Sequence, residues 1–269
     1  MQKDLSQIRI AHGRRGVDTP AQQDHFHNYY ELFYLHSGKC RFFLKDRICQ
    51  PENGDFVLIA PGDLHHSLYY PGITCDIVAL YFKDSFLIPS LFAHTLPSQS
   101  FMGTVPAPYR EEFHALLSRM FTESEGLDAH SPAFMTCYLN ELLLLLMRHS
   151  VMWEEAPELV NAKDADIMAA AKYIYRNFRN PITLEEAAAI AGLSPTYFSK
   201  KFKLLTGMGF KEYLNHIRLR HAAAALLNTE GSITDIALSY GFNDSNYFKD
   251  LFKKEYGKSP RSYRKSRGD

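Results

Sequence analysis

The sequence has no net charge, no closely spaced cysteine pair and no long apolar run. Its 30 Lys plus Arg balance 30 Asp plus Glu, which by itself argues against a nucleic-acid partner. The cysteines lack any Cys-x-x-Cys spacing and nothing at the start of the chain resembles a signal peptide, so we expect a cytoplasmic protein. The longest apolar run, Leu142 to Met147, is far shorter than the roughly twenty residues of a membrane span. We therefore expect no membrane partner.

The neutral total conceals two oppositely charged halves. Residues 163–269 hold 18 Lys plus Arg against 11 Asp plus Glu, a balance of +7, whereas residues 1–162 hold 12 against 19, a balance of −7. A length of 269 residues is typical of two domains. The sequence therefore predicts an acidic first domain and a basic second domain that is suited to binding phosphate.

The basic half contains one helical pattern written twice, at an offset of about fifty residues. Each copy begins with a hydroxyl residue, Thr183 or Ser232, three places before an acid, which is typical of a helix N-terminus. A glycine, Gly192 or Gly241, follows the short helix and can take the positive φ of a sharp turn. Helix, glycine turn and second helix predict a helix-turn-helix unit, whose second helix commonly enters the DNA major groove.

Residue spacing separates the two faces of each second helix. Phenylalanines four residues apart, at 198 and 202 and again at 248 and 252, mark the side that faces the core. The opposite side is polar in both copies and can hydrogen-bond base edges or neutralise phosphate. The alternative for each residue is a solvated helix face. The outward residues predicted to contact DNA are Thr196, Ser199, Lys200 and Lys203 in the first copy, and Ser245, Asn246, Lys249 and Lys253 in the second.

The length of the segment that connects the two copies also suits binding to successive grooves of DNA. Lys211 to Leu227 predicts one helix, about 25 Å long at 1.5 Å per residue. With the width of the flanking helices, it could hold two recognition helices about one DNA turn, roughly 34 Å, apart. One chain could then read two successive major grooves.

The region from about Asp166 to Arg264 resembles the DNA-binding domain of the AraC/XylS family of bacterial transcription regulators. The second copy carries the resemblance most closely, in Ile233 to Ala237, in Gly241-Phe242 and in Pro260 to Arg264. The resemblance implies an RNA polymerase partner and favours activation. It places the base contacts at Thr196, Ser199 and Lys200 and at Ser245, Asn246, Lys249 and Asp250. Asp250 departs from the basic residues common there, so the second helix is expected to bind less tightly.

Residues 1 to 105 alternate β-like runs with turn signals. Aromatic and β-branched residues predict the strands, and clusters containing Gly, Pro, Asn and Ser separate them. Short strands at this spacing favour a sandwich or a barrel. The predicted strands are Tyr29 to His36, Lys39 to Lys45, Asp55 to Ile59 and Thr74 to Phe82.

Two short patterns in this part resemble the motifs of the cupin barrel, which the AraC/XylS family often carries as its effector sensor. They are His25-x-His27-x3-Glu31-x6-Gly38 and Gly54-x7-Gly62-x2-His65. The first lacks the leading glycine of its cupin motif, and in the second Ala60 replaces a proline and Tyr69 replaces an asparagine.

Alternation along a strand would place His25, His27 and Glu31 on one face if that strand starts early. We expect a small organic effector, a sugar or another metabolite, to contact His25, His27, Glu31 and His65. The same four side chains could instead bind Fe, Mn, Ni or Zn. They could also form a satisfied internal pair with no ligand at all.

Two further helices are predicted, Tyr109 to Phe121 and Pro132 to Met147. The second is apolar almost all round, so it must be buried on several sides. The resemblance implies that such helices dimerise, and packing within one chain is the alternative. We expect a homodimer through Leu139, Leu142, Leu143 and Leu146.

The expected architecture is multidomain, with α and β parts. It comprises a cupin-like β-barrel over residues 1–105, a helical dimerisation segment over 106–150, an acidic linker over 151–164 and an all-α double helix-turn-helix domain over 165–267. The expected function is a sequence-specific DNA-binding transcription regulator whose barrel senses a small molecule, without a cofactor or catalytic residues. The alternative is a metal-dependent cupin enzyme, which would leave the repeat and the basic half without purpose.

Overall fold

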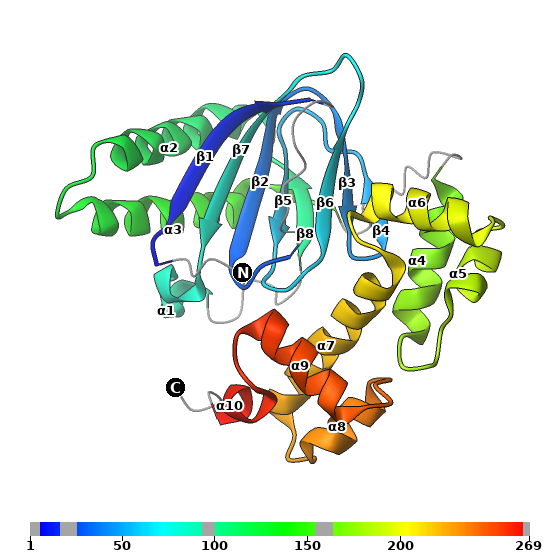
Figure 1. Cartoon of the computed structure of the whole chain (residues 1–269). Coiled ribbons are helices and arrows are strands. Elements are labelled where there is room, and N and C mark those ends of the chain that lie inside the picture. The colour runs from blue at the N-terminus through cyan, green and yellow to red at the C-terminus, as the bar shows by residue number, and fades with distance from the viewer. Residues whose placement is uncertain (1–5, 17–25, 93–99, 154–163, 266–269) are drawn as a thin grey trace. The chain divides into compact units, whose positions relative to one another are not determined.

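The structure is a computed structural model that describes residues 6–16, 26–92, 100–153 and 164–265. The chain divides into two compact units, Met1–Leu159 and Val160–Asp269. The first unit contains all the described strands and the second contains helices only (Figure 1). This division confirms the predicted combination of a β-rich domain and an all-α domain.

Two antiparallel sheets form the first unit. The larger sheet contains β1 (Arg9–Arg15), β2 (Tyr30–Ser37), β5 (Asp55–Ile59), β7 (Cys75–Phe82), β8 (Phe101–Thr104) and β9 (Val151–Met152). The smaller sheet contains β3 (Cys40–Leu44), β4 (Arg47–Cys49) and β6 (His65–Tyr69). The strand orders are β1-β7-β2-β5-β8-β9 and β4-β3-β6. The four predicted strands are confirmed as β2, β3, β5 and β7, whereas the other five strands were not predicted.

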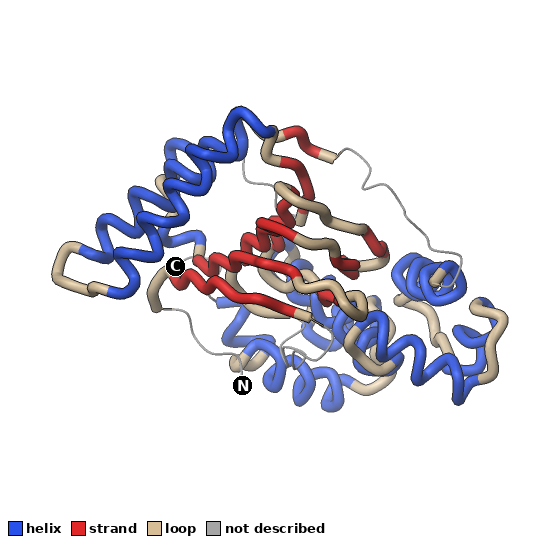
Figure 2. Tube along the Cα trace, turned by 90° about the horizontal axis from the view of Figure 1, so that it is seen from above, coloured by secondary structure: helices blue, strands red, loops and turns tan. Residues whose placement is uncertain are grey.

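Both faces of the larger sheet are covered. Alternation along β2 places Phe33 and Leu35 in a core with Phe42 of the smaller sheet. Leu32 and Tyr34 point the other way, into a core shared with the helices α2 (Ala107–Glu125) and α3 (Ser131–His149). Figure 2 shows these two helices side by side as a pair next to the strands. Two short turns of helix, η1 (Asp84–Phe86) and α1 (Pro89–Phe92), follow β7.

The helix α3 corrects the prediction about the dimer contacts. Leu139, Leu142, Leu143 and Leu146 are between 0% and 3% exposed. They lie in the core formed with α2 and the larger sheet, so these four leucines are not available to a partner subunit. The large apolar side chains that α3 exposes are Phe134, Leu144 and Met147.

The second unit contains seven described helices. They are α4 (Ala165–Asn177), α5 (Leu184–Ile190), α6 (Pro195–Thr206), α7 (Phe210–Asn228), α8 (Ile233–Ser239), α9 (Ser245–Tyr256) and α10 (Pro260–Lys265). The predicted long connecting helix is confirmed as α7. It contacts α4 and α6 of the first copy and also α8, α9 and α10 of the second (Figure 1).

The segment predicted as a linker, residues 151–164, is only partly described. Its first residues form β9, which pairs with β8 at the edge of the larger sheet, and residues 154–163 lie outside the described part. No helix in the described ranges is long and apolar enough to cross a membrane.

Candidate DNA interface and effector site

Each helix-turn-helix unit begins at a helix cap that the sequence predicted. Thr183 Oγ1 accepts a hydrogen bond from the backbone N–H of Glu186 at 3.1 Å. Ser232 Oγ accepts one from the backbone N–H of Asp235 at 3.0 Å. These bonds satisfy amides that have no partner inside the helix. The starts of α5 and α8 are therefore fixed by local sequence.

The sharp turns that lead into α6 and α9 depend on glycine. Gly192 has a φ of +65° and Gly241 a φ of +85°, a left-handed conformation that other residues adopt at a cost. After each turn a side chain caps the next helix. Ser194 accepts from the N–H of Tyr197 at 3.4 Å, and Asp244 accepts from the N–H of Asn246 at 2.7 Å. Each recognition helix therefore starts at a side-chain cap.

The inward face of each recognition helix is aromatic and fully buried. Phe198 and Phe202 pack with ring centroids 5.1 Å apart, and Phe248 and Phe252 pack at 5.5 Å. All four rings are 0% exposed. The predicted contact residues Thr196, Lys200, Lys203, Asn246, Lys249, Asp250 and Lys253 are exposed, and Ser199 and Ser245 are half-buried. The structure thus leaves both polar faces accessible to a ligand.

Two tyrosines on these helices were missed by the sequence reasoning. Tyr197 is 55% exposed and Tyr247 is 40% exposed, and each directly precedes the first buried phenylalanine of its helix. The Tyr247 hydroxyl accepts a hydrogen bond from Asn215 Nδ2 at 3.1 Å, and Lys211 Nζ lies 5.9 Å from its ring centroid. The two tyrosines occupy equivalent positions in the two copies, so comparing the copies could have identified them.

The two residues that follow α4 contact the connecting helix α7 and the residue just after α8. The ring of Phe178 stacks on His221 of α7 with centroids 4.4 Å apart. Arg218 of α7 donates from Nε to the Phe178 carbonyl oxygen at 2.7 Å. The Arg179 guanidinium carbon lies 5.1 Å from the centroid of Tyr240, just after α8. We call these five residues the α4 anchor. Through them the end of α4 contacts α7 and the residue that follows α8.

A buried polar cluster lies at one end of the β unit. Glu31 projects from β2 on the same face as Phe33 and Leu35, and His65 starts β6. His27 precedes β2, which begins at Tyr30, so the strand does not start early enough to include it. His25 lies outside the described residues.

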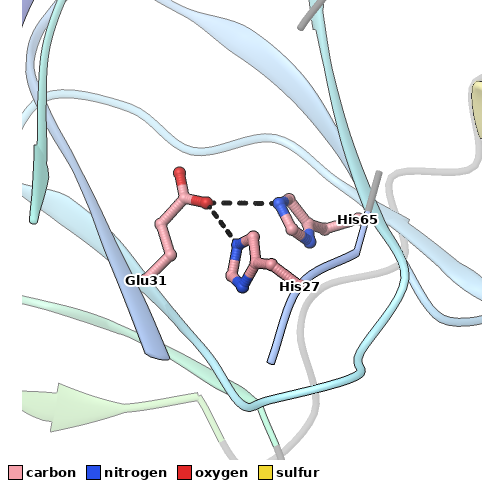
Figure 3. A group of neighbouring side chains, drawn as sticks. All are labelled: His27, Glu31 and His65. Atoms are coloured by element: carbon pink, nitrogen blue, oxygen red, sulfur yellow. Dashed lines mark hydrogen bonds and ion pairs between the residues drawn. The ribbon is translucent and has the colours of Figure 1, made fainter. Parts of the chain in front are cut away.

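His27 and His65 both contact the same carboxylate oxygen of Glu31. Glu31 Oε2 lies 2.9 Å from Nε2 of His27 and 3.3 Å from Nε2 of His65 (Figure 3). The three residues, which we call the His–Glu–His cluster, are only 3%, 6% and 8% exposed for His27, Glu31 and His65. The ring of Tyr29 stacks on His27 with centroids 4.0 Å apart. The structure therefore brings together three of the four residues predicted to contact an effector.

The charges in this cluster support one another. Burial raises the pKa of Glu31, but hydrogen bonds from His27 and His65 and the charges of both rings together lower it further, to about 2. Burial lowers the pKa of His65, but the Glu31 carboxylate outweighs this effect and the net direction is upward. The Glu31 carboxylate and the His65 ring therefore stabilise each other's charged forms.

Two family comparisons match this organisation. Residues 187–266 match a helix-turn-helix domain, and residues 8–143, half of the chain, match the AraC-like ligand binding domain. The chain belongs to the AraC family. As a member of that family, it is a DNA-binding transcription regulator with a ligand-binding domain, as the sequence predicted.

Relatives of this AraC-family chain extend through both of its units. The transcriptional activator RhaS of Enterobacter sp. is 26% identical over 250 residues, which cover 91% of this chain and 88% of RhaS. The activator RhaR of Klebsiella pneumoniae subsp. pneumoniae is 28% identical over 252 residues, which cover 90% and 86%. The solved C-terminal domain of AraT, a response regulator from Geobacillus stearothermophilus, is 37% identical over 38% of this chain and 84% of that one, with a TM-score of 0.36.

The AraC-family ligand-binding domain of this chain contains residues that could hold a metal ion. One ligand atom from each of His27, Glu31 and His65 lies within 4.8 Å of the others. Imidazole and carboxylate are ligands that suit Zn, Fe, Ni and Mn. The donor set and its spacing therefore fit a metal as well as a hydrogen-bonding organic effector.

Proposed function

We propose that this regulator activates transcription by binding promoter DNA through α6 and α9 under the control of a small molecule bound in its β unit. Activation rather than repression is supported by RhaS and RhaR, which are both named as transcriptional activators. Such a role requires RNA polymerase as a partner and the cytoplasm as the location. We favour it over the alternative of a cupin enzyme, which would leave the basic unit without a task.

The proposal that the chain binds DNA depends mainly on the exposed polar faces of the repeated helices α6 and α9. The α4 anchor supports it. The anchor joins the end of α4 to α7 and to the residue after α8. The helices α4 and α7 also contact α6 while α7 contacts α9, which supports a fixed relation between the two recognition helices. Two helices held in a fixed relation can enter two grooves together. The proposed contacts are Thr196, Ser199, Lys200 and Lys203 with Ser245, Asn246, Lys249 and Asp250, to which we add Tyr197 and Tyr247.

Operator affinity should fall linearly with salt on a double logarithmic scale. Genome-wide footprinting would first identify the operator. Each phosphate neutralised by a lysine releases a counterion, so the slope should be about −0.9 per contacted phosphate. Fluorescence anisotropy with the operator duplex across a salt series measures this slope. A slope near zero would contradict the proposed interface.

The His–Glu–His cluster is our proposed effector site. Its polar atoms are buried yet gathered at one end of the β unit, beside the aromatic rings of Tyr29 and Tyr81. A few polar groups among aromatic walls are typical of small-molecule sites. A sugar or another metabolite could bind there. Calorimetry of the full chain with a metabolite panel tests this proposal.

We also propose a homodimer, through the exposed side of α3 rather than through its buried leucines. Phe134, Leu144 and Met147 are 50%, 39% and 36% exposed. Leu144 and Met147 lie three residues apart near the end of α3, and all three side chains remain exposed although α2 and the larger sheet cover the buried side of the helix. Large apolar side chains left exposed next to one another mark a candidate protein interface.

Leu144→Glu should therefore convert dimers into monomers. Burying an unpaired carboxylate in an apolar interface should weaken self-association by at least about tenfold. Sedimentation at tens of micromolar measures it. Leu127→Glu is the matched control, because Leu127 is 67% exposed in the turn between α2 and α3 and receives the same charge. A wild-type monomer, with and without DNA, would contradict the proposed dimer.

A further inference from the structure

The two recognition helices carry opposite charges at the centre of their outward faces. In α9 the buried rings of Phe248 and Phe252 stand four residues apart, and Asp250 lies midway between them. At about 100° per residue, Asp250 lies about 160° around the helix from each ring. The same construction on α6 selects Lys200, midway between the two buried phenylalanines of that helix. Both side chains are exposed, so one face is centred on a cation and the other on an anion.

The Asp250 carboxylate has lysine neighbours on α9 but no ion pair with them. Lys253 and Lys254 lie three and four residues further on, at spacings where helix side chains can pair. Neither forms an ion pair with Asp250 in the described part of the chain. Lys249 Nζ lies 3.4 Å from Asn246 Oδ1 instead. The carboxylate is therefore available to a ligand.

The chemistry of a carboxylate restricts which base it can contact. An ionised carboxylate accepts hydrogen bonds and cannot donate them. Phosphates repel it, so it contributes to DNA binding only where it meets a donor. In the major groove the donors are N4 of cytosine and N6 of adenine, whereas guanine and thymine present acceptors there. Adenine also places the acceptor N7 beside N6, and cytosine is therefore the base that suits Asp250 best.

We propose that Asp250 selects cytosine in the half-site that α9 reads, by accepting a hydrogen bond from N4, and that Lys200 selects guanine in the half-site of α6. Lysine donates to O6 and N7 of guanine. The inference rests on the proposed DNA-binding function, because it specifies the base at one position of each half-site. Since the two copies read opposite hydrogen-bond patterns, the operator is asymmetric and the chain binds it in one direction.

Base substitution across the footprinted operator, with affinity of the full chain measured by fluorescence anisotropy, tests the proposal. At one position under α9, replacing C·G by G·C should weaken wild-type binding by at least about fivefold, the usual cost of one wrong base pair. Asp250→Asn should bind the two duplexes almost equally, because an amide both donates and accepts. A wild type with no such cytosine in the operator would overturn the proposal.

Asp250→Lys provides a result that general damage to the fold could not produce. Because lysine donates to guanine, the preference at this position should reverse from C·G to G·C, while preferences at the other positions stay as in the wild type. If Asp250→Lys instead binds every duplex more tightly without a reversal, Asp250 acts only by repelling phosphates and the proposal is wrong.

Glu212→Gln is the matched control, because Glu212 is exposed on α7 and the change removes one negative charge from the same unit. It should alter the affinity for all duplexes alike and keep the cytosine preference; loss of that preference here would also count against Asp250. Operator binding by the wild type without a cytosine preference would remove the inference and leave the regulator standing. Absent operator binding would remove the proposed interface itself.

Discussion

Alanine at both Lys200 and Lys249 should strongly weaken specific operator binding at concentrations that saturate the wild type. Each lysine is exposed on the polar face of its recognition helix, and loss of one base contact typically costs about 1–3 kcal/mol. The two lie on different copies of the repeat, so their losses should add to about 2–6 kcal/mol. That loss corresponds to a reduction in affinity of roughly thirtyfold or more. Fluorescence anisotropy with the footprinted operator measures it.

The control for this double variant must remove the same kind of charge from another place. Lys254 is exposed on α9 outside the proposed contact set, so Lys254→Ala should change affinity much less than Lys249→Ala. Discrimination between the operator and an unrelated duplex should fall in the double variant and persist in the control. Unchanged discrimination in the double variant would show that these lysines do not read bases.

The all-α unit could be predicted closely from sequence because its signals are local. Thr183 and Ser232 accept from amides only three residues away, so a short window of sequence contains both partners. The glycine turns have the same property. What the sequence could not show was the α4 anchor, in which Phe178 meets His221 more than forty residues later.

The β unit was harder to predict because strand pairing joins distant segments. The strand β1 pairs with β7, with Arg9 opposite Tyr81, and its sequence Arg-Ile-Ala-His-Gly-Arg-Arg contains few of the apolar residues that mark a strand. The two-residue strand β9 is defined only by its pairing with β8. Neither strand has a local pattern that reveals its partner.

The candidate effector site shows both the use and the limit of spacing arguments. Spacing selected Glu31 and His65, which the structure brings together from two strands. It would have placed His27 on the same strand only if that strand started early, and β2 starts at Tyr30. The ring nevertheless reaches Glu31, since its Nδ1 hydrogen bond to the Tyr29 carbonyl turns it back toward the cluster. Spacing alone contains no information about such a turn.

The error about α3 has a comparable cause. A helix that is apolar on nearly every side must be covered, but its sequence does not say whether the cover comes from its own chain or from a partner. Here α2 and the larger sheet cover Leu142 and Leu143, and the side left over contains Leu144. A shift of a single residue along a helix thus separates a core position from a candidate interface.

Gly241→Ala should destabilise the DNA-binding unit far more than the equivalent change, Gly192→Ala. Both glycines have positive φ values, so each substitution should cost about 1–2 kcal/mol from backbone conformation alone. At Gly192 no heavy atom lies within 4 Å of the added carbon. At Gly241 the added carbon would lie 2.8 Å from the Arg179 carbonyl oxygen and 2.8 Å from Arg218 Nε.

Neither neighbour of Gly241 can move aside easily. The Arg179 oxygen belongs to the backbone, and Arg218 is held by bonds to the carbonyl oxygens of Phe178 and Asn180. Overpacking against fixed atoms adds about 1–3 kcal/mol, so the total for Gly241→Ala should reach about 2–5 kcal/mol. Urea denaturation followed by circular dichroism of the helices measures both variants, and equal losses would show that the close approach does not matter.

The same pair of variants also tests whether the α4 anchor sets the relation between the recognition helices. Gly241 stands where α8 turns toward α9 and where the end of α4 approaches most closely. If the anchor positions α9 relative to α6, Gly241→Ala should weaken operator binding at temperatures where the protein is still folded, because two grooves must be entered together. Gly192→Ala should then retain more affinity than Gly241→Ala. If the folded Gly241→Ala variant binds the operator as tightly as the wild type, the anchor is not needed to position α9 in its groove.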